Sequence, residues 1–284
     1  MQKGQATWLA TLDRHGTGNS HSTFILCAAA DAKIADSPAP AEAQVIDSAN
    51  SIIDFVAFWP SLESLLTSVP STGILFNQYR DCNPEVDIPN AAAVRMANLR
   101  NYLHQACSSA SVLVVGEAAG PWGARFSGVP FVGEKQLLDP SFPIRGERSS
   151  LFAPLRQTRL NPPFVSLSAK LFWEVLLPYR DRIVVWDAVP FHTHKLGDAL
   201  TVRNPSKKEV AQFGEMLRLV EAYVQPSRIV AVGRRAFEAL EALGKSPVYV
   251  RHPSMGGKAR FATGMQEAFG EKSALTVPRP GPPA

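Results

Sequence analysis

The chain has 284 residues, with 29 Lys and Arg against 25 Asp and Glu, so its net charge is +4. A hydrophobic fraction of 45% and a charged fraction of 19% are typical of a globular protein and exclude disorder over most of the chain. The longest apolar run, residues 24–30, is much shorter than the roughly 20 residues that a membrane helix needs. The sequence therefore predicts no membrane span.

The charge is unevenly distributed. Residues 1–89 carry 4 basic and 10 acidic side chains, a balance of −6, whereas residues 90–284 carry +10. A basic body suits a polyanionic partner such as DNA, because contacts between phosphates and Lys or Arg release counterions. The three cysteines are far apart and form no CxxC pair, so we expect neither a metal centre nor another cofactor. So few cysteines also suit a reducing compartment, which predicts a cytoplasmic protein.

The first part of the chain divides into an extension and two helices. Residues 1–45 are rich in Ala, Ser, Thr, Gly and Asp, and we expect a loosely ordered extension there. From residue 48 to 69 apolar groups recur at helical spacing, with an interruption expected at Pro60. A second helix is predicted over 91–106, with Asn90 as its N-cap.

Four short β-branched runs follow, and the segments between them have helical patterns. The predicted strands cover 111–116, 182–189, 228–233 and 247–252, and the predicted helices cover 166–177, 205–223 and 234–243. Continuous rather than alternating hydrophobicity is typical of strands buried on both faces, hence of a parallel sheet. The alternation predicts a three-layer α/β/α sandwich around a mainly parallel, four-stranded sheet. We expect one domain over 46–270 and a disordered tail over 271–284.

Three polar segments stand where predicted strands end, at 116–134, 186–194 and 251–265. Because parallel strands end at the same edge of a sheet, the three segments can converge on one pocket. They would bring together Glu117, Asp187 and His252, which form a candidate catalytic constellation.

The residues of these segments resemble motifs of the uracil-DNA glycosylase superfamily. GEAAG…GVPFVG, starting at Gly116, is similar to the opening motif of the family-4 enzymes, and HPSMGGKARFATG, starting at His252, is similar to the HPS motif and its family-5 continuation. The resemblance covers about residues 85–270. It implies hydrolysis of the N-glycosidic bond between uracil and deoxyribose, with the base flipped out of the DNA stack into a pocket.

The resemblance also implies roles for individual residues. Phe131 would stack on the flipped base, and His252 would donate a hydrogen bond to uracil O2 as negative charge develops there. Glu117 would position or deprotonate the attacking water, as carboxylates do in glycoside hydrolysis. Each residue also has a structural alternative: a core Phe, a strand-ending His, and a carboxylate satisfied by backbone N–H groups. The motif places further pocket residues at Gly116, Ala118 and Gly120.

Asp187 departs from the pattern, because most relatives have Asn there. An Asn amide can donate to uracil O4 and accept from N3–H, whereas an ionised Asp only accepts. Three interpretations stay open: a protonated Asp, a preference shifted toward an amino-bearing base, or a structural Asp with another residue reading the base. The neighbouring His192 and His194 could serve the pocket or phosphates, or be packing residues.

Two other departures concern the pocket wall and the iron–sulfur cluster. The tyrosine that excludes the thymine methyl group in family 1 would fall near Gly120, so the pocket is roomier unless Trp122 fills it. Families 4 and 5 use four cysteine ligands for a cluster, one of them near the position of Phe191. This chain has no Cys beyond Cys107, so we expect it to be cluster-free.

The segment after HPS, residues 255–260, is predicted to be a DNA-binding loop. Met255 is a candidate wedge for the gap left by the flipped base, and Ser254, Lys258 and Arg260 are candidate phosphate contacts. The structural alternative is a basic turn before a helix.

Together these features predict a monomeric, monofunctional glycosylase acting on uracil in single- or double-stranded DNA. Three alternatives remain: a protein that captures uracil-DNA without turnover, with or without a covalent bond; a glycosylase for other deaminated bases; and a nucleotide-handling α/β enzyme. The Gly-rich turn at 116–123 fits neither nucleotide-binding glycine motif, which counts against the last of these.

Overall fold

The computed structural model describes residues 54–106, 110–152 and 161–270, which all belong to the compact unit Asn50–Ala284. The predicted extension over 1–45, the domain boundary at 46 and the tail over 271–284 lie outside the described residues.

Four parallel strands form the main sheet in the order β3-β2-β5-β6. Their bounds are β2 Val112–Ala118, β3 Ile183–Val189, β5 Arg228–Val232 and β6 Val248–Val250. Each predicted strand is found, with its ends within two residues of the expected positions. β3 is buried along its whole length, as its continuous apolar sequence predicts. A separate antiparallel pair, β1 Leu75–Phe76 with β4 His192–Thr193, was not predicted, because two-residue strands leave no periodic pattern.

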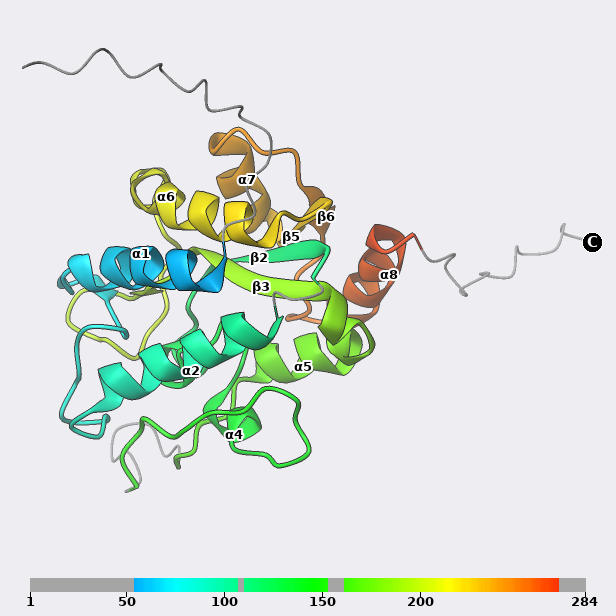
Figure 1. Cartoon of the computed structure of the whole chain (residues 1–284). Coiled ribbons are helices and arrows are strands. Elements are labelled where there is room, and N and C mark those ends of the chain that lie inside the picture. Colours follow the sequence, from blue (N-terminus) through cyan, green and yellow to red (C-terminus); the bar gives the residue numbers. More distant parts are fainter. Residues whose placement is uncertain (1–53, 107–109, 153–160, 271–284) are drawn as a thin grey trace, which may run out of the picture. The chain divides into compact units, whose positions relative to one another are not determined.

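Helices cover both faces of the sheet (Figure 1). α6 and α7 lie on one face, with α1 packed against α6, whereas α2 and α5 lie on the other face. The predicted α/β/α sandwich is therefore confirmed for the described residues. The helix bounds are α1 Phe55–Ser68, α2 Ala91–Ala106, α3 Ala124–Ser127, α4 Glu134–Leu137, α5 Leu167–Leu176, the 3-10 helix η1 Leu177–Arg182, α6 Lys207–Val224, α7 Arg234–Ala242 and α8 Lys258–Ala268. No helix in these ranges is long and apolar enough to cross a bilayer.

Two expectations about helices were wrong. α1 does not stop at Pro60 but continues through it to Ser68. Pro60 has no N–H to give to the carbonyl of Val56, and Val56 is 80% exposed, so water can reach that part of the first turn. The predicted loop over 255–260 is also shorter than expected, because α8 already begins at Lys258.

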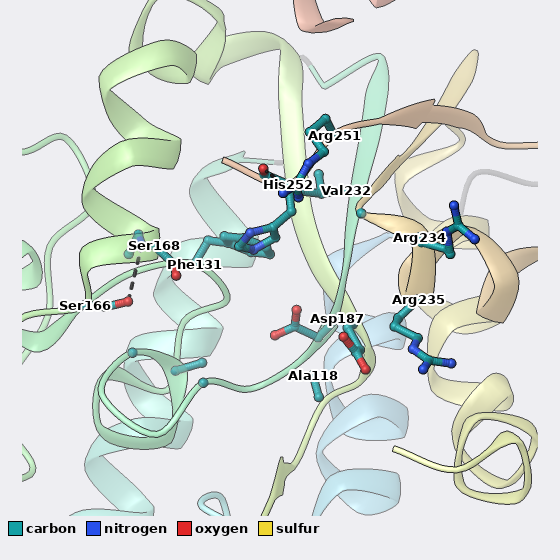
Figure 2. A pocket seen from close by; sticks show the side chains of 16 residues that line it. Ala118, Phe131, Ser166, Ser168, Asp187, Val232, Arg234, Arg235, Arg251 and His252 are labelled. Carbon is teal, nitrogen blue, oxygen red and sulfur yellow. Dashed lines mark hydrogen bonds between the residues drawn. The ribbon is translucent and has the colours of Figure 1, made fainter. Parts of the chain in front are cut away.

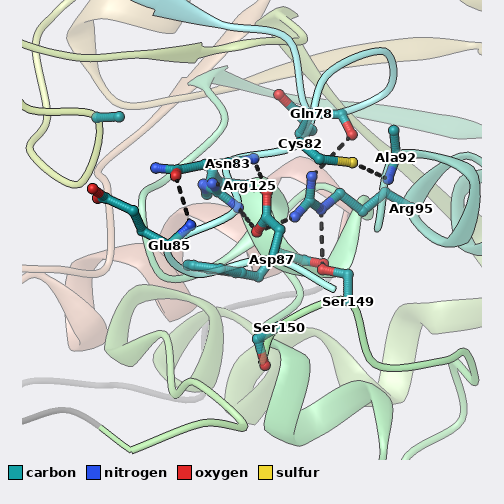
Figure 3. A network of polar contacts seen from close by, with 12 residues as sticks. Gln78, Cys82, Asn83, Glu85, Asp87, Ala92, Arg95, Arg125, Ser149 and Ser150 are labelled. Carbon is teal, nitrogen blue, oxygen red and sulfur yellow. Dashed lines mark hydrogen bonds and ion pairs between the residues drawn. The ribbon is translucent and has the colours of Figure 1, made fainter. Parts of the chain in front are cut away.

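A buried polar network joins the segment before α2 to α2, α3 and Ser149 (Figure 3). Both oxygens of Asp87 accept hydrogen bonds from the guanidinium of Arg125, at 2.6 and 3.2 Å. Arg95 forms a second ion pair with Asp87 and donates from Nε to the Ser149 hydroxyl at 3.0 Å. Burial alone would raise the pKa of Asp87, but the two guanidinium groups outweigh it and hold that pKa below its usual value.

Candidate functional site

A cavity of about 280 Å³ opens at the carboxyl ends of the parallel strands. Its position at β2, where neighbouring connections run to opposite sides of the sheet, is a topological switch point of the kind that binds ligands in open α/β sheets. The segments leaving β2, β3 and β6 meet here, as expected. Six residues singled out in the sequence line the cavity: Glu117, Ala118, Gly120, Phe131, Asp187 and His252. In Figure 2, Phe131 and His252 lie together on one side of Asp187, and Arg235 lies on the other.

Gly116 lies behind the cavity and permits its geometry. It is paired in register with Asp187 on the adjacent strand. A Cβ atom at this position would lie 2.3 Å from Cε2 of Phe131 and 2.4 Å from Oδ1 of Asp187. Only a glycine therefore allows the aromatic ring and the carboxylate to approach the strand so closely.

Asp187 is 3% exposed, and its Oδ1 has no hydrogen-bond partner within the described part of the chain. Burial, with a further contribution from the Glu117 carboxylate, raises the pKa of Asp187 to about 7. A structural carboxylate would be satisfied by donors from the protein, so this environment argues against a purely structural role. Near neutral pH the side chain can exist as an acid or as a carboxylate.

Glu117 follows the last fully buried positions of β2, and it lies in the cavity with Oε1 unpartnered by any described group. The backbone N–H groups of the turn therefore do not satisfy this oxygen. Burial raises the pKa of Glu117; Arg235 opposes that shift and Glu238 adds to it. A carboxylate whose oxygen is left without a protein donor is free to accept a hydrogen bond from a ligand or a water.

Phe131 has a left-handed backbone conformation, with φ of 53°, which is uncommon for a residue other than glycine. Its carbonyl accepts a hydrogen bond of 2.9 Å from the indole N–H of Trp173, and its ring stacks on Phe172 with centroids 4.3 Å apart. These contacts hold an energetically unfavourable conformation, which is the usual mark of a functional position. The ring contacts the core on one side and lines the cavity on another.

The ring nitrogens of His252 have distinct roles. Nδ1 lies 3.2 Å from the backbone N–H of Ser254 and 2.7 Å from the Ser254 hydroxyl. Because a backbone N–H can only donate, Nδ1 is the acceptor and the proton of the neutral ring is on Nε2. Burial, together with nearby Arg251, lowers the pKa of His252 and favours this neutral form. The imidazole therefore offers an N–H donor, and its centroid lies 6.0 Å from that of the Phe131 ring.

The segment after His252 is a tight exposed turn followed by α8. Met255 is 91% exposed and has φ of 53°. Lys258 is not a free cation, because its Nζ lies 2.5 Å from Oε2 of Glu174 and ties α8 to α5. Arg260 is exposed in the first turn of α8, and Ser254 is engaged with His252.

The cavity has open space next to Gly120, where an added Cβ would meet nothing within 4 Å. Trp122 does not fill this space. It packs against Phe126 and Phe164, with ring centroids 6.3 and 5.3 Å away, in a small separate cluster.

The sequence analysis did not predict all the residues that line the cavity. Gly233, directly after β5, and Arg234 and Arg235, the first residues of α7, also line the cavity, because β5 ends at the same edge as the other three strands. The end of the predicted strand over 228–233 is the signal in the sequence that points to these residues. Ser166 and Ser168, at the start of α5, also line the cavity, and no motif marked them.

The chain does not fit a four-cysteine cluster. It has three cysteines in all, and the described one, Cys82, is exposed, with Sγ near the carbonyl of Pro89. Phe191, near the expected ligand position, is fully buried against Phe213. No group of three metal-ligating side chains occurs in the ranges that the structure describes.

An aromatic face, a neutral imidazole donor, one buried carboxylate and one partly buried carboxylate line this small cavity of an α/β/α sandwich, an arrangement that fits a DNA glycosylase. The family model of the uracil DNA glycosylase superfamily matches residues 103–280, and the chain belongs to this superfamily. The match extends ten residues beyond the predicted domain end at 270. A solved structure, wild-type SMUG2 from Pedobacter heparinus, is 13% identical, with a TM-score of 0.47, over 75% of this chain and 97% of that one. No curated protein sequence matches significantly.

Proposed function

We propose that this protein is a monofunctional uracil-DNA glycosylase that flips uracil out of DNA, hydrolyses its N-glycosidic bond and leaves an abasic site. The observation that carries the proposal is the neutral ring of His252. The backbone N–H of Ser254 donates to Nδ1, so the ring proton is on Nε2, and this N–H is a donor in the cavity that His252 shares with Phe131 and Glu117. At about 280 Å³, just below the roughly 300–1,000 Å³ of typical ligand pockets, the cavity suits a single base.

The chemistry follows from where charge develops. As the bond between C1′ and the base nitrogen breaks, its electron pair goes to the uracil ring, and the Nε2–H of His252 stabilises that anion at O2. Phe131 offsets part of the cost of unstacking, since base–aromatic stacking contributes about 1–3 kcal/mol. Glu117 accepts the proton of the water that attacks C1′, and its negative charge stabilises the cationic sugar.

Two further observations support water as the nucleophile and one chain as the active unit. No Lys is among the described residues that line the cavity, so the site offers no amine to form an imine with the sugar. All the groups proposed to act on the base come from one chain, which fits a monomer over the predicted domain 46–270.

The turn at Met255 would contact DNA. Its 91% exposed side chain and left-handed backbone suit a wedge that enters the gap left by the flipped base. Ser254 and Arg260 would bind phosphates. Lys258 would bind a phosphate either while it stays paired with Glu174 or after that ion pair breaks.

A second candidate, a glycosylase for other bases, is favoured by Asp187. A protonated Asp187 can donate to uracil O4 and accept from N3–H, whereas the carboxylate favours a base that presents an amino group or an additional N–H. Because the pKa of Asp187 lies near 7, the protein would hold both forms at neutral pH.

We therefore expect uracil excision to depend on a group titrating near pH 7. The folded-state pKa of Asp187 is raised, so the acid form that suits uracil is present below about pH 7 and is lost as the pH rises. Single-turnover rates of the wild type, measured between pH 5.5 and 8.5, should fall as the pH rises through the pKa of Asp187. In Asp187→Asn this decrease should disappear. If the decrease persists in that variant, Asp187 does not recognise the base.

The experiment that tests the main proposal uses limiting protein and an oligonucleotide with one uracil, followed by alkaline cleavage at the abasic site. Product beyond one equivalent supports a glycosylase. Product that stops at one equivalent, with a protein band linked to DNA, indicates capture without turnover. No cleavage of uracil in single- or double-stranded DNA, with cleavage at xanthine or hypoxanthine, supports the second candidate instead.

Gly120→Tyr is expected to narrow the range of bases. The open space beside Gly120 admits a 5-substituent on uracil, and a tyrosine ring would occupy it. In a tight pocket one methylene group changes kcat/KM by roughly 10–200-fold. We expect a loss of this size for 5-hydroxymethyluracil but not for uracil, measured as the ratio of the two kcat/KM values. Gly120→Ala is the matched control and should leave that ratio unchanged, because its Cβ meets nothing; equal losses for both bases in the Tyr variant would contradict the assignment.

A further inference from the structure

His192 is fully buried, and the mechanism above does not use it. It lies on β4, outside the cavity wall. Its two ring nitrogens face two backbone carbonyl groups: Nδ1 lies 2.9 Å from the oxygen of Ala119, and Nε2 lies 3.1 Å from the oxygen of Ala199. A carbonyl oxygen can only accept, so each nitrogen would have to donate to satisfy both.

The neutral imidazole can satisfy only one of these carbonyls. Burial lowers the pKa of His192 to about 4, and the charges of Arg125 and His194 oppose protonation further, while the two carbonyl contacts counteract this shift. At neutral pH the ring therefore has one N–H for two acceptors. The shorter contact is the one to Ala119, which favours the tautomer with the proton on Nδ1.

Ala119 lies in the segment that carries the site. It is 2% exposed and stands between Glu117 and Gly120, which both line the cavity. The carbonyl of Gly120 is held by the N–H groups of Gly123, at 3.2 Å, and Arg125, at 3.3 Å. The contact with His192 fixes the segment one residue earlier, close to Glu117.

His192 is itself held rigidly. Its backbone N–H donates to Oε1 of Gln78 at 3.2 Å, and Nε2 of the same amide donates to the carbonyl of Pro190 at 2.7 Å. Gln78 is fully buried, and β4 is paired with β1 in register. A donor on such a support can define the position of the carbonyl that it binds.

We propose that His192 is a positioning residue, whose Nδ1–H holds the carbonyl of Ala119 and thereby fixes the backbone that presents Glu117 to the reacting base. This inference rests on the proposed function for its kinetic consequences. The contact itself, however, can be tested whether or not uracil is the substrate.

Two substitutions separate the contacts of the ring. The amide nitrogen of Asn lies at about the position of Nδ1, so His192→Asn can keep the bond to Ala119 but cannot reach Ala199. The longer His192→Gln reaches the position of Nε2 and does the reverse. Each variant loses one of the two contacts, so a role in stability alone would affect both similarly.

We expect single-turnover rates on uracil-DNA to stay near the wild-type value in His192→Asn and to fall by about 10–100-fold in His192→Gln, with little change in KM. A misplacement of about 1 Å at a catalytic group can cost 10²-fold, which sets this range. Equal rates in the two variants, whether both normal or both reduced in parallel with Tm, would overturn the proposal. His104→Gln is the control, because that residue of α2 is exposed and does not line the cavity.

Hydrogen–deuterium exchange provides a readout that does not require activity. His192→Gln should raise exchange in peptides covering 117–123, whereas His192→Asn, which keeps the donor to Ala119, should leave exchange there near the wild-type level. The same exchange pattern in both variants would overturn the proposal. If the wild type fails to excise uracil but the two patterns differ as expected, the proposed substrate is wrong and the positioning role of His192 stands.

Discussion

His252→Ala is expected to lower kcat for uracil excision by roughly 10²–10³-fold, the usual cost of removing one hydrogen-bond donor to a developing anion. The Nε2–H matters most when the bond to uracil breaks, because the charge at O2 is greatest then. The loss should therefore fall on kcat, while the Kd for uracil-DNA changes little. Single-turnover rates and binding to a DNA containing a non-cleavable uracil analogue measure the two quantities.

The matched control is His104→Ala, the same substitution at an exposed residue of α2 that does not line the cavity. It should leave both kcat and Kd unchanged. Ser254→Ala should leave kcat nearly unchanged, since its backbone N–H still donates to Nδ1 of His252 and keeps the proton on Nε2, and should weaken only DNA binding, because the hydroxyl is a proposed phosphate contact. If His252→Ala retains full kcat, the imidazole does not stabilise the leaving base.

The arrangement of this site was largely predictable from the sequence, because parallel strands end at one edge of a sheet. Continuous apolar runs identified the strands, and the polar residues after them had to meet. That reasoning placed Glu117, Asp187 and His252 around one cavity, where the structure has them. It also predicted Gly116 as a pocket residue, whereas the structure has it behind the cavity, paired with Asp187, and the reason for a glycine there became visible only from the strand register.

The environment of each group was not predictable. Whether Asp187 has a partner depends on side chains from several segments, and a sequence pattern does not specify their packing. The tautomer of His252 depends on a backbone N–H two residues later, in a turn whose conformation the sequence left open. The positions of Ser166 and Ser168 also depend on how α5 packs, and no short motif records that.

The buried network at Asp87 shows the same limit most clearly. Asp87 and Arg95 lie eight residues apart and Arg125 a further 30 along the chain, and all three look like ordinary surface charges in the sequence. In the structure all three side chains are fully buried, and one carboxylate pairs with two guanidinium groups. The sequence patterns that reveal strands and helices carry no information about such a contact.

Asp87→Asn is expected to lower the free energy of unfolding by about 3–5 kcal/mol, because it leaves two buried guanidinium groups without their counter-charge. Arg125 is also enclosed by the rings of Phe76 and Phe126, at 4.4 and 4.2 Å from their centroids, so water cannot readily replace the carboxylate. Urea unfolding measures the change. The network holds α3, whose first residue, Ala124, lines the cavity, so activity should fall at temperatures where the fold is still largely populated.

The control is Asp181→Asn, which removes the charge of an exposed carboxylate paired with Arg180 at 3.2 Å. Such surface pairs contribute about 0–1 kcal/mol, so its unfolding curve should nearly match that of the wild type. The pKa of Asp87 is depressed in the folded state, so its stabilising contribution is present above the unfolded-state pKa of about 4 and is lost as the pH falls through the folded-state pKa. The gap between wild type and Asp87→Asn should therefore be constant at neutral pH and narrow in acid. A gap below 1 kcal/mol at pH 7 would mean that the two guanidinium groups do not depend on Asp87 for their burial.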